Sequence, residues 1–248
     1  MSSFPPALLV EGRRVPGSLE ALRRLVRALD VQPGERVLLL GAGDGTSLRV
    51  LARDAGANVT AVEWDPKLVA ALEARVRDEA LSGRVTVRQG DVAGLPSQGF
   101  ESVLVDTLPP PGSITEFAAK LRELLVVNGR LGITLPVAVG LSTQEPVQTF
   151  WSHELGMPLQ RPTATLGLIE KAGYEPQWAE SLSDELMAEY YRLLDEQVQT
   201  ADPAVAERAK KAIELFRTGP GRTGASHAML VARRREPGEK PPPARTAG

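Results

Sequence analysis

Three glycines with an aspartate among them follow a short apolar run in VLLLGAGDG, which spans residues 37–45. Gly41 and Gly43 permit positive φ angles and close approach of a ligand to the backbone, and Gly45 lets a following helix begin close to the sheet. Glu63 lies about 20 residues downstream, at the end of the next β-rich run, where a carboxylate can accept hydrogen bonds from both hydroxyls of a ribose. Together these residues predict a nucleoside-binding site.

The spacing of the glycines argues against a dinucleotide. NAD-dependent enzymes normally carry G-x-G-x-x-G, which places a diphosphate at the N-terminus of a helix. Here the spacing is G-x-G-x-G, and Thr46 stands where the final glycine would be. Asp44 inside the turn would also repel a diphosphate. We therefore expect a nucleoside without phosphates, with an oxidoreductase of dinucleotide type as an alternative.

The elements that would position these residues alternate between strands and helices. The expected strands are residues 36–40, 58–64, 84–89, 100–106 and 129–136. The expected helices between them, and before the first, are residues 18–29, 47–56, 65–83 and 114–127. This alternation implies right-handed crossovers and a parallel sheet, which is an α/β doubly wound fold.

After residue 136 the alternation changes, and longer helical patterns appear. We expect helices over 163–173, 183–200 and 203–219, a strand over 174–180 and a closing strand over 226–234. The predicted architecture is Rossmann-like: a seven-stranded, mostly parallel sheet with helices on both faces, an antiparallel last strand and a helical cover. Expected helix caps are Ser18, Asp65, Ser113 and Asp202 at N-termini, and Gly56 and Gly83 at C-termini.

We predict one domain over residues 1–235. It would comprise an N-terminal arm and helix (1–30) and two substrate-cover insertions (137–165 and 181–220). Residues 236–248 are rich in proline and charge, so we expect a disordered tail there.

The composition excludes several classes of function. The chain has 248 residues, 29 Lys plus Arg and 31 Asp plus Glu, a net charge of -2, no cysteine and two histidines. It therefore offers no basic excess for nucleic acid, no thiolate chemistry and no histidine-rich metal site. No segment is apolar for the roughly 18 residues of a membrane helix, so we expect a cytoplasmic protein without a membrane partner. The oligomeric state stays open.

In their order and spacing, the motifs over roughly residues 18–180 resemble the class I S-adenosylmethionine-dependent methyltransferases. The motifs are VLLLGAGDG, VEWD, VRQGDVAGLP, FESVLVD and LRELLVVNGRLGIT. The resemblance implies S-adenosylmethionine as the cofactor and S-adenosylhomocysteine as the product. It also implies that the glycine loop passes close to the methionine and ribose portions of the cofactor; this loop comprises Gly41, Ala42, Gly43, Asp44 and Gly45.

Further roles follow from the same resemblance. Glu63 would hold the ribose hydroxyls and Trp64 would pack on the adenine, while Asp91 would accept from the adenine amino group and the Val92 backbone would face the ring. Members of this class usually carry an acid two residues before the first glycine, to fix the methionine ammonium group. This chain has Leu39 there, so Asp106, at the end of the fourth strand, or Asp44 is the expected substitute.

The acceptor side is expected from the N-terminal arm, the segment after the fifth strand and the helices before the last strand. An apolar pocket for a small organic molecule would be lined by Phe150, Trp151, Met157, Tyr190 and Tyr191. His153 is the candidate general base, and His227, before an apolar strand, is interpreted as structural.

The sequence thus predicts a methyltransferase that acts on an oxygen, nitrogen or carbon atom of a small molecule, with no metal. The alternative from another class is a non-catalytic S-adenosylmethionine-binding or S-adenosylhomocysteine-binding protein, or an interaction protein, on a degenerate methyltransferase fold. The residue that motivates this alternative is Leu39.

Overall fold

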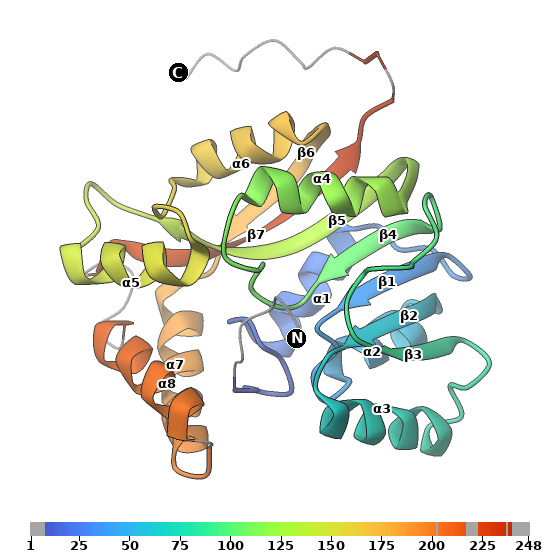
Figure 1. The fold of residues 1–248 in the computed structure, drawn as a ribbon, viewed down its shortest axis with the longest axis horizontal. Coiled ribbons are helices and arrows are strands. Elements are labelled where there is room, and N and C mark those ends of the chain that lie inside the picture. The colour runs from blue at the N-terminus through green and yellow to red at the C-terminus, as the bar shows by residue number, and fades with distance from the viewer. Residues whose placement is uncertain (1–7, 202, 217–222, 237, 240–248) are drawn as a thin grey trace.

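A seven-stranded sheet runs through the computed structural model, which describes residues 8–201, 203–216, 223–236 and 238–239 (Figure 1). Its strand order is β3-β2-β1-β4-β5-β7-β6. The strands are β1 (Arg36–Leu40), β2 (Asn58–Glu63), β3 (Val85–Gln89), β4 (Phe100–Val105), β5 (Leu125–Ala138), β6 (Tyr174–Ser181) and β7 (Ala225–Arg234). All neighbours from β3 to β5 are parallel, and β7 is antiparallel to both β5 and β6. The predicted Rossmann-like sheet with an antiparallel last strand is confirmed.

Helices pack on both faces of the sheet because the central strands are apolar on both sides. The helices are α1 (Leu19–Ala28), α2 (Thr46–Arg49), the π-helical turn η1 (Val50–Asp54), α3 (Pro66–Asp78), α4 (Ile114–Leu124), α5 (Glu145–Leu155), α6 (Pro162–Lys171), α7 (Asp184–Val198) and α8 (Pro203–Phe216). In β1, Val37 and Leu39 belong to one buried cluster, and Leu38 and Leu40 belong to the other.

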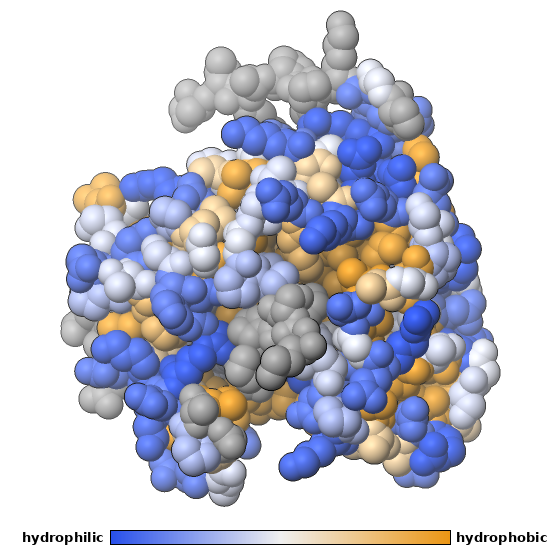
Figure 2. Space-filling view, in the orientation of Figure 1, coloured by the Kyte–Doolittle hydropathy of each residue, from blue (hydrophilic) through white to orange (hydrophobic). Residues whose placement is uncertain are grey.

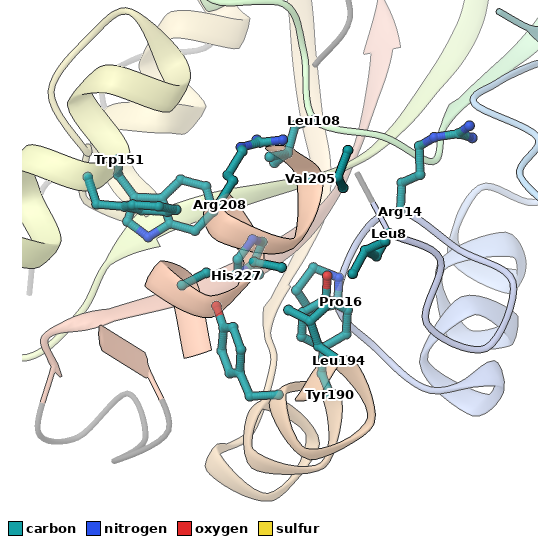
Figure 3. A pocket seen from close by; sticks show the side chains of 14 residues that line it. Leu8, Arg14, Pro16, Leu108, Trp151, Tyr190, Leu194, Val205, Arg208 and His227 are labelled. Carbon is teal, nitrogen blue, oxygen red and sulfur yellow. The ribbon is translucent and has the colours of Figure 1, made fainter. Parts of the chain in front are cut away.

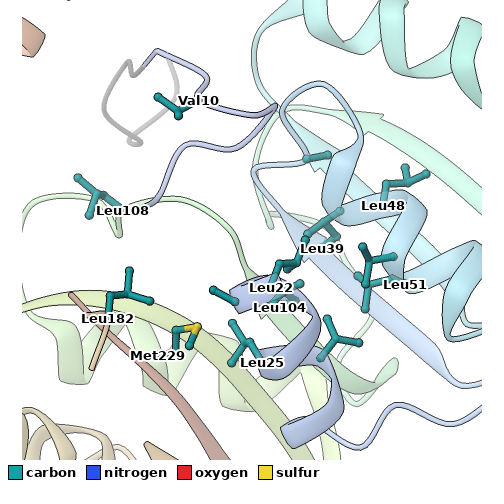
Figure 4. Packing of buried hydrophobic residues seen from close by; sticks show 14 of the residues in the cluster. Val10, Leu22, Leu25, Leu39, Leu48, Leu51, Leu104, Leu108, Leu182 and Met229 are labelled. Atoms are coloured by element: carbon teal, nitrogen blue, oxygen red, sulfur yellow. The ribbon is translucent and has the colours of Figure 1, made fainter. Parts of the chain in front are cut away.

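The first cluster unites α1 with the sheet and continues toward α5, α7 and α8. In Figure 4, Leu22 and Leu25 of α1 lie against Leu39 and Leu104 of the sheet. The second cluster lies under α4 and α6. The outside of the helices is mostly hydrophilic, with hydrophobic patches between them (Figure 2), as expected for amphipathic helices that bury one face.

Three predicted N-caps are confirmed by their hydrogen bonds. The Ser18, Asp65 and Ser113 side chains accept from the backbone N–H groups of Ala21, Lys67 and Glu116. Gly56 has the left-handed φ of 74° that was expected after the η1 turn. The proposed cap Asp202 lies outside the described residues, as do residues 237 and 240–248 of the predicted tail.

Two predicted helix ends are wrong. The third helix ends at Asp78 rather than at Gly83, and Ala80, with a φ of 56°, takes the left-handed conformation instead. The fourth helix ends at Leu124, and β5 begins at Leu125, which pairs with Phe100. The two valines at 126–127 are β-branched and favour the extended strand over another helical turn.

We call the helices α5, α7 and α8 the cover; they lie near the carboxyl end of β5 (Figure 1). Residues 8–17, which we call the N-terminal strap, lie between this cover and the carboxyl ends of β1, β2 and β4. Among the described residues, no helix is both long and apolar enough to cross a membrane.

Candidate cofactor and acceptor site

The glycine loop after β1 has room for backbone only. Gly41, Gly43 and Gly45 have φ angles of 79°, 58° and 97°. A Cβ added to Gly41 would lie 2.8 Å from the Thr107 Cβ atom, and one added to Gly43 would lie 2.3 Å from the carbonyl oxygen of Gly12. The loop is therefore a backbone-lined cradle, as a closely held ligand requires.

Glu63 ends β2 beside this loop and is fully buried. Its oxygens accept from the backbone N–H groups of Gly43 at 3.0 Å, Trp64 at 2.8 Å and Asp65 at 3.0 Å. The Arg14 guanidinium donates to both oxygens as well, at 2.6 and 2.9 Å. Glu63 therefore carries five hydrogen bonds, about as many as a carboxylate can accept.

The other predicted adenosine contacts lie on the loops next to Glu63. The Arg14 guanidinium stands over the Trp64 ring, 4.5 Å from its centroid. The loop after β3 is joined to Glu63 by a 2.9 Å bond from the Gly90 N–H to the Glu63 carbonyl oxygen. Asp91 on this loop is exposed and accepts from the Ala93 N–H at 2.8 Å, and Val92 is partly buried against the second cluster.

The two candidate substitutes for the missing acid have different surroundings. Asp44 accepts from the Thr46 backbone N–H at 2.9 Å and from its hydroxyl at 2.8 Å, so it is bound to the first residue of the short helix α2. Asp106 follows β4 and is 1% exposed. It accepts from the Arg13 guanidinium at 2.6 and 2.9 Å and from the Ser47 hydroxyl. Of the two candidates, Asp106 is thus the buried one.

The sequence reasoning missed Arg13 and Arg14, which are 2% and 4% exposed. Two adjacent arginines directly after Gly12 were the available signal. These residues follow a tight turn at Glu11 and Gly12, and one arginine meets the carboxylate after β4 while the other meets that at the end of β2.

A mostly apolar cavity lies between the strap, the cover and β7 (Figure 3). It has an empty volume of about 560 Å³, part of it open to solvent. Four of the five predicted pocket residues line it: Phe150, Trp151, Tyr190 and Tyr191. The lining also includes residues that the sequence did not single out, among them Leu8, Pro16, Leu108, Leu194 and Arg208.

Met157, the fifth predicted pocket residue, does not line this cavity. It borders a smaller hollow near Ile114 and Leu135. His153, the candidate base, also lies elsewhere: its side chain is 88% exposed on α5, next to Glu154, because it faces away from the buried Trp151 two residues earlier in the helix.

His227 of β7 lines the cavity instead (Figure 3). It is 2% exposed, and its ring packs edge-on against Trp151 with 5.3 Å between centroids. Burial lowers its pKa to about 3, so the ring is neutral at physiological pH. Within the described part of the chain, its Nδ1 atom and the Trp151 Nε1 atom have no hydrogen-bond partner.

The chain is similar to known methyltransferases. A methyltransferase domain model matches residues 37–129, which hold the glycine loop, Glu63 and Asp106. The protein-L-isoaspartate O-methyltransferase of Methylorubrum populi is 32% identical over 58% of this chain and 68% of its own length. That of Anaeromyxobacter dehalogenans is 37% identical over 48% of this chain and only 54% of its own length. Ribosomal RNA small subunit methyltransferases match over still shorter shares of their lengths.

Solved structures show the same fold. A methyltransferase from Geobacter sulfurreducens, crystallised with S-adenosylhomocysteine, superposes with a TM-score of 0.71 at 20% identity, covering 91% of this chain and 95% of that chain. The relatives and the glycine-loop cradle agree on one classification. The chain belongs to the class I S-adenosylmethionine-dependent methyltransferases.

Proposed function

We propose that this protein transfers a methyl group from S-adenosylmethionine to a small, largely apolar acceptor bound in the cavity beneath the cover. One observation carries the proposal: Arg14 lines the cavity and also contacts Glu63. The acceptor cavity therefore adjoins the candidate ribose site, and an acceptor there would lie close to a bound cofactor. Transfer of a group between two molecules requires such adjacent sites.

The residues present fit the cofactor. The bare backbone of Gly41 and Gly43, the buried Glu63 carboxylate and the Trp64 ring would hold its methionine, ribose and adenine parts, and the buried carboxylate of Asp106 would hold the ammonium group. When bound, S-adenosylmethionine supplies an electrophilic methyl group, so the chain's own contribution is mainly alignment and exclusion of water.

The cavity lining suggests the character of the acceptor. Aromatic and aliphatic walls favour an apolar body. The Trp151 Nε1–H would donate to a polar atom of the acceptor, and the neutral imidazole of His227 would accept from a hydroxyl or amine on it. A group with a pKa of about 3 is a weak base at neutral pH, so we assign His227 a role in orienting the acceptor rather than in removing its proton.

The relatives bring other acceptors into consideration, namely protein isoaspartate and ribosomal RNA. A net charge of -2 disfavours RNA, which binds to basic surfaces. The mostly apolar lining of the cavity is also a poor match for an isoaspartyl carboxylate, since its two arginines, Arg14 and Arg208, already pair with Glu63 and Glu154, and unpaired charged groups are costly to bury. A non-catalytic cofactor-binding protein is the second candidate, favoured by Leu39 in place of the usual acid.

The test is a methyl-transfer assay that measures S-adenosylhomocysteine release. The panel contains apolar small molecules with a hydroxyl or amine, an isoaspartyl peptide and small-subunit ribosomal RNA. Release with members of the first group only is the expected result. Release with the peptide or RNA alone would replace the proposed acceptor, and cofactor binding without any release would favour the non-catalytic candidate.

A pair of variants ties this activity to the cavity. Leu194 is 5% exposed and lines the cavity, whereas Leu141 is 98% exposed. Leu194→Trp should fill the cavity and abolish transfer while leaving S-adenosylhomocysteine binding intact. Leu141→Trp, which adds the same bulk at the surface, should leave both unchanged. Full activity in Leu194→Trp would exclude this cavity as the acceptor site.

A further inference from the structure

We propose that the N-terminal strap occupies part of the cofactor site and that cofactor binding displaces it. The proposal rests on the cofactor assignment above and adds a regulatory element to the same site. Its basis is that the strap meets the glycine loop, the ribose acid and the acid after β4 at once, through three consecutive residues: Gly12, Arg13 and Arg14.

Arg14 and a ribose would compete for the Glu63 carboxylate. The two Arg14 Nη atoms donate to the two carboxylate oxygens, and three backbone N–H groups also donate to them. A ribose would need the same two oxygens for its hydroxyls. Because the carboxylate is already saturated, Arg14 and the ribose cannot both be bound to it, and one must leave before the other enters.

The backbone of the strap also contacts the glycine loop. The Gly12 carbonyl oxygen accepts from the Asp44 N–H at 3.2 Å. Gly12 has a φ of 81°, and a Cβ added there would lie 1.9 Å from a carboxylate oxygen of Asp44. The strap therefore lies directly on the glycine loop, and a side chain at position 12 would require the Asp44 carboxylate to move.

The strap also connects the two halves of the active site. Leu8, Arg14 and Pro16 line the acceptor cavity together with residues of α7 and α8. When Arg14 leaves Glu63, this wall of the cavity must move with it. Cofactor binding would therefore reshape the acceptor cavity, and we infer that the cofactor binds before the acceptor.

Calorimetry with S-adenosylhomocysteine tests the competition. Arg14→Ala removes the competing guanidinium, and Gly12→Ala places a methyl group against the Asp44 carboxylate and so weakens the contact of the strap with the loop without changing any charge. Both should bind S-adenosylhomocysteine about tenfold more tightly than the unmodified protein, since each weakens the contact that the ligand must break. Equal or weaker binding in both variants would overturn the proposal, because the strap would then be neutral or would assist binding.

Two matched control variants test whether a gain in affinity comes from the strap or from backbone strain or the loss of an arginine in general. Gly34 has a φ of 82°, nearly that of Gly12, but no atom lies within 4 Å of a Cβ added there, so Gly34→Ala carries the same backbone strain without the clash. Arg23→Ala removes an arginine from a surface ion pair with Asp54. Neither should change the affinity. A gain in Gly34→Ala equal to that in Gly12→Ala would mean that strain alone, and not the strap, is responsible.

Limited proteolysis of the unmodified protein gives a readout that needs no variant. Trypsin cleaves after arginine, and the buried Arg13 and Arg14 should resist it, whereas the exposed Arg27 serves as an internal reference. S-adenosylhomocysteine should accelerate cleavage after Arg13 and Arg14 relative to cleavage after Arg27. Unchanged or slower relative cleavage would overturn the proposal. If the ligand binds and releases the strap but no acceptor is methylated, only the proposed enzymatic function fails.

Discussion

Arg14 and Glu63 form a bidentate ion pair, with Nη to Oε distances of 2.6 and 2.9 Å, in which the side chains are 3% and 0% exposed. The two partners are not equally dependent on each other. Glu63 keeps three backbone N–H donors if Arg14 is removed. Within the described part of the chain, Arg14 would keep its contact with the Trp64 ring, and its Nε atom already lacks a hydrogen-bond partner.

This asymmetry predicts the order of two destabilising substitutions. Glu63→Gln leaves a buried guanidinium without a counter-charge and should lower the free energy of unfolding by about 3 kcal/mol. Arg14→Met keeps the apolar stem over Trp64 and leaves a carboxylate with backbone donors, so about 1 kcal/mol is expected. Urea denaturation of both variants measures the difference. A larger loss in Arg14→Met than in Glu63→Gln would contradict the assignment.

The Arg14–Glu63 pair also predicts that the effect of Glu63→Ala on cofactor affinity depends on whether Arg14 is present. In the Arg14→Ala protein, Glu63→Ala should weaken S-adenosylhomocysteine binding by about 1 to 3 kcal/mol, because charged hydrogen bonds to the ribose are lost. In the unmodified protein the loss should be smaller, since the substitution also removes the anchor of the competing strap. Calorimetry on the four proteins measures both losses. Unchanged affinity on removal of Glu63 in the Arg14→Ala background would make the ribose assignment wrong.

The sheet and its order along the chain could be predicted because they depend on local patterns. Buried parallel strands are continuous apolar runs, and caps such as Ser18 and Asp65 mark helix starts within a few residues. The helix ends at Asp78 and Leu124 were less predictable. An alanine took the left-handed position at 80, and pairing with β4 drew residue 125 into a strand.

The acceptor side could be predicted only in part. Phe150, Trp151, Tyr190 and Tyr191 stood out because aromatic residues are sparse in this chain. The sequence favoured His153 as the base and His227 as a structural residue, but it could not show which ring faces the cavity. The orientation of α5 leaves His153 exposed, and the register of β7 brings His227 to the cavity. The strap was missed because its contacts, such as Arg13 with Asp106, connect residues 93 positions apart.

His227 predicts a specific dependence of stability on pH. Its pKa is about 3 in the folded protein and about 6.5 when unfolded. Below pH 6.5 the unfolded chain therefore binds a proton that the folded one does not, so stability is lost as the pH falls from 6.5 toward 3, by roughly 4 to 5 kcal/mol in total.

The measurement compares the free energy of unfolding of His227→Phe with that of the unmodified protein from pH 7 to pH 3. The variant should lose less stability over this range, by the amount attributed to His227. His153→Gln is the control for replacement of a histidine that lies outside the cavity, since the His153 side chain is 88% exposed. Parallel profiles for His227→Phe and the unmodified protein would show that the ring protonates freely in the folded state.

The last prediction concerns two segments of the cover, residues 140–160 with α5 and residues 183–200 with α7, which we expect to close over the cofactor. The cofactor must be shielded from water during transfer, yet the product must leave, so part of the site has to open. Gly140 and Gly156 flank α5 with φ angles of 68° and 66°. Gly140 has open space around it, whereas Gly156 packs against Gly112, so the hinge should lie at Gly140.

Hydrogen exchange with and without S-adenosylhomocysteine measures this closure. Exchange in both cover segments should slow when the ligand is added, because a closed cover exposes fewer backbone amides. The strands around Leu38 and Val103 lie in the centre of the sheet and should stay protected in both conditions. Equal exchange in the cover segments with and without ligand would mean that Trp151, Tyr191 and Phe216, whose rings lie 5.5 to 5.6 Å apart in neighbouring pairs, are fixed packing rather than a moving lid.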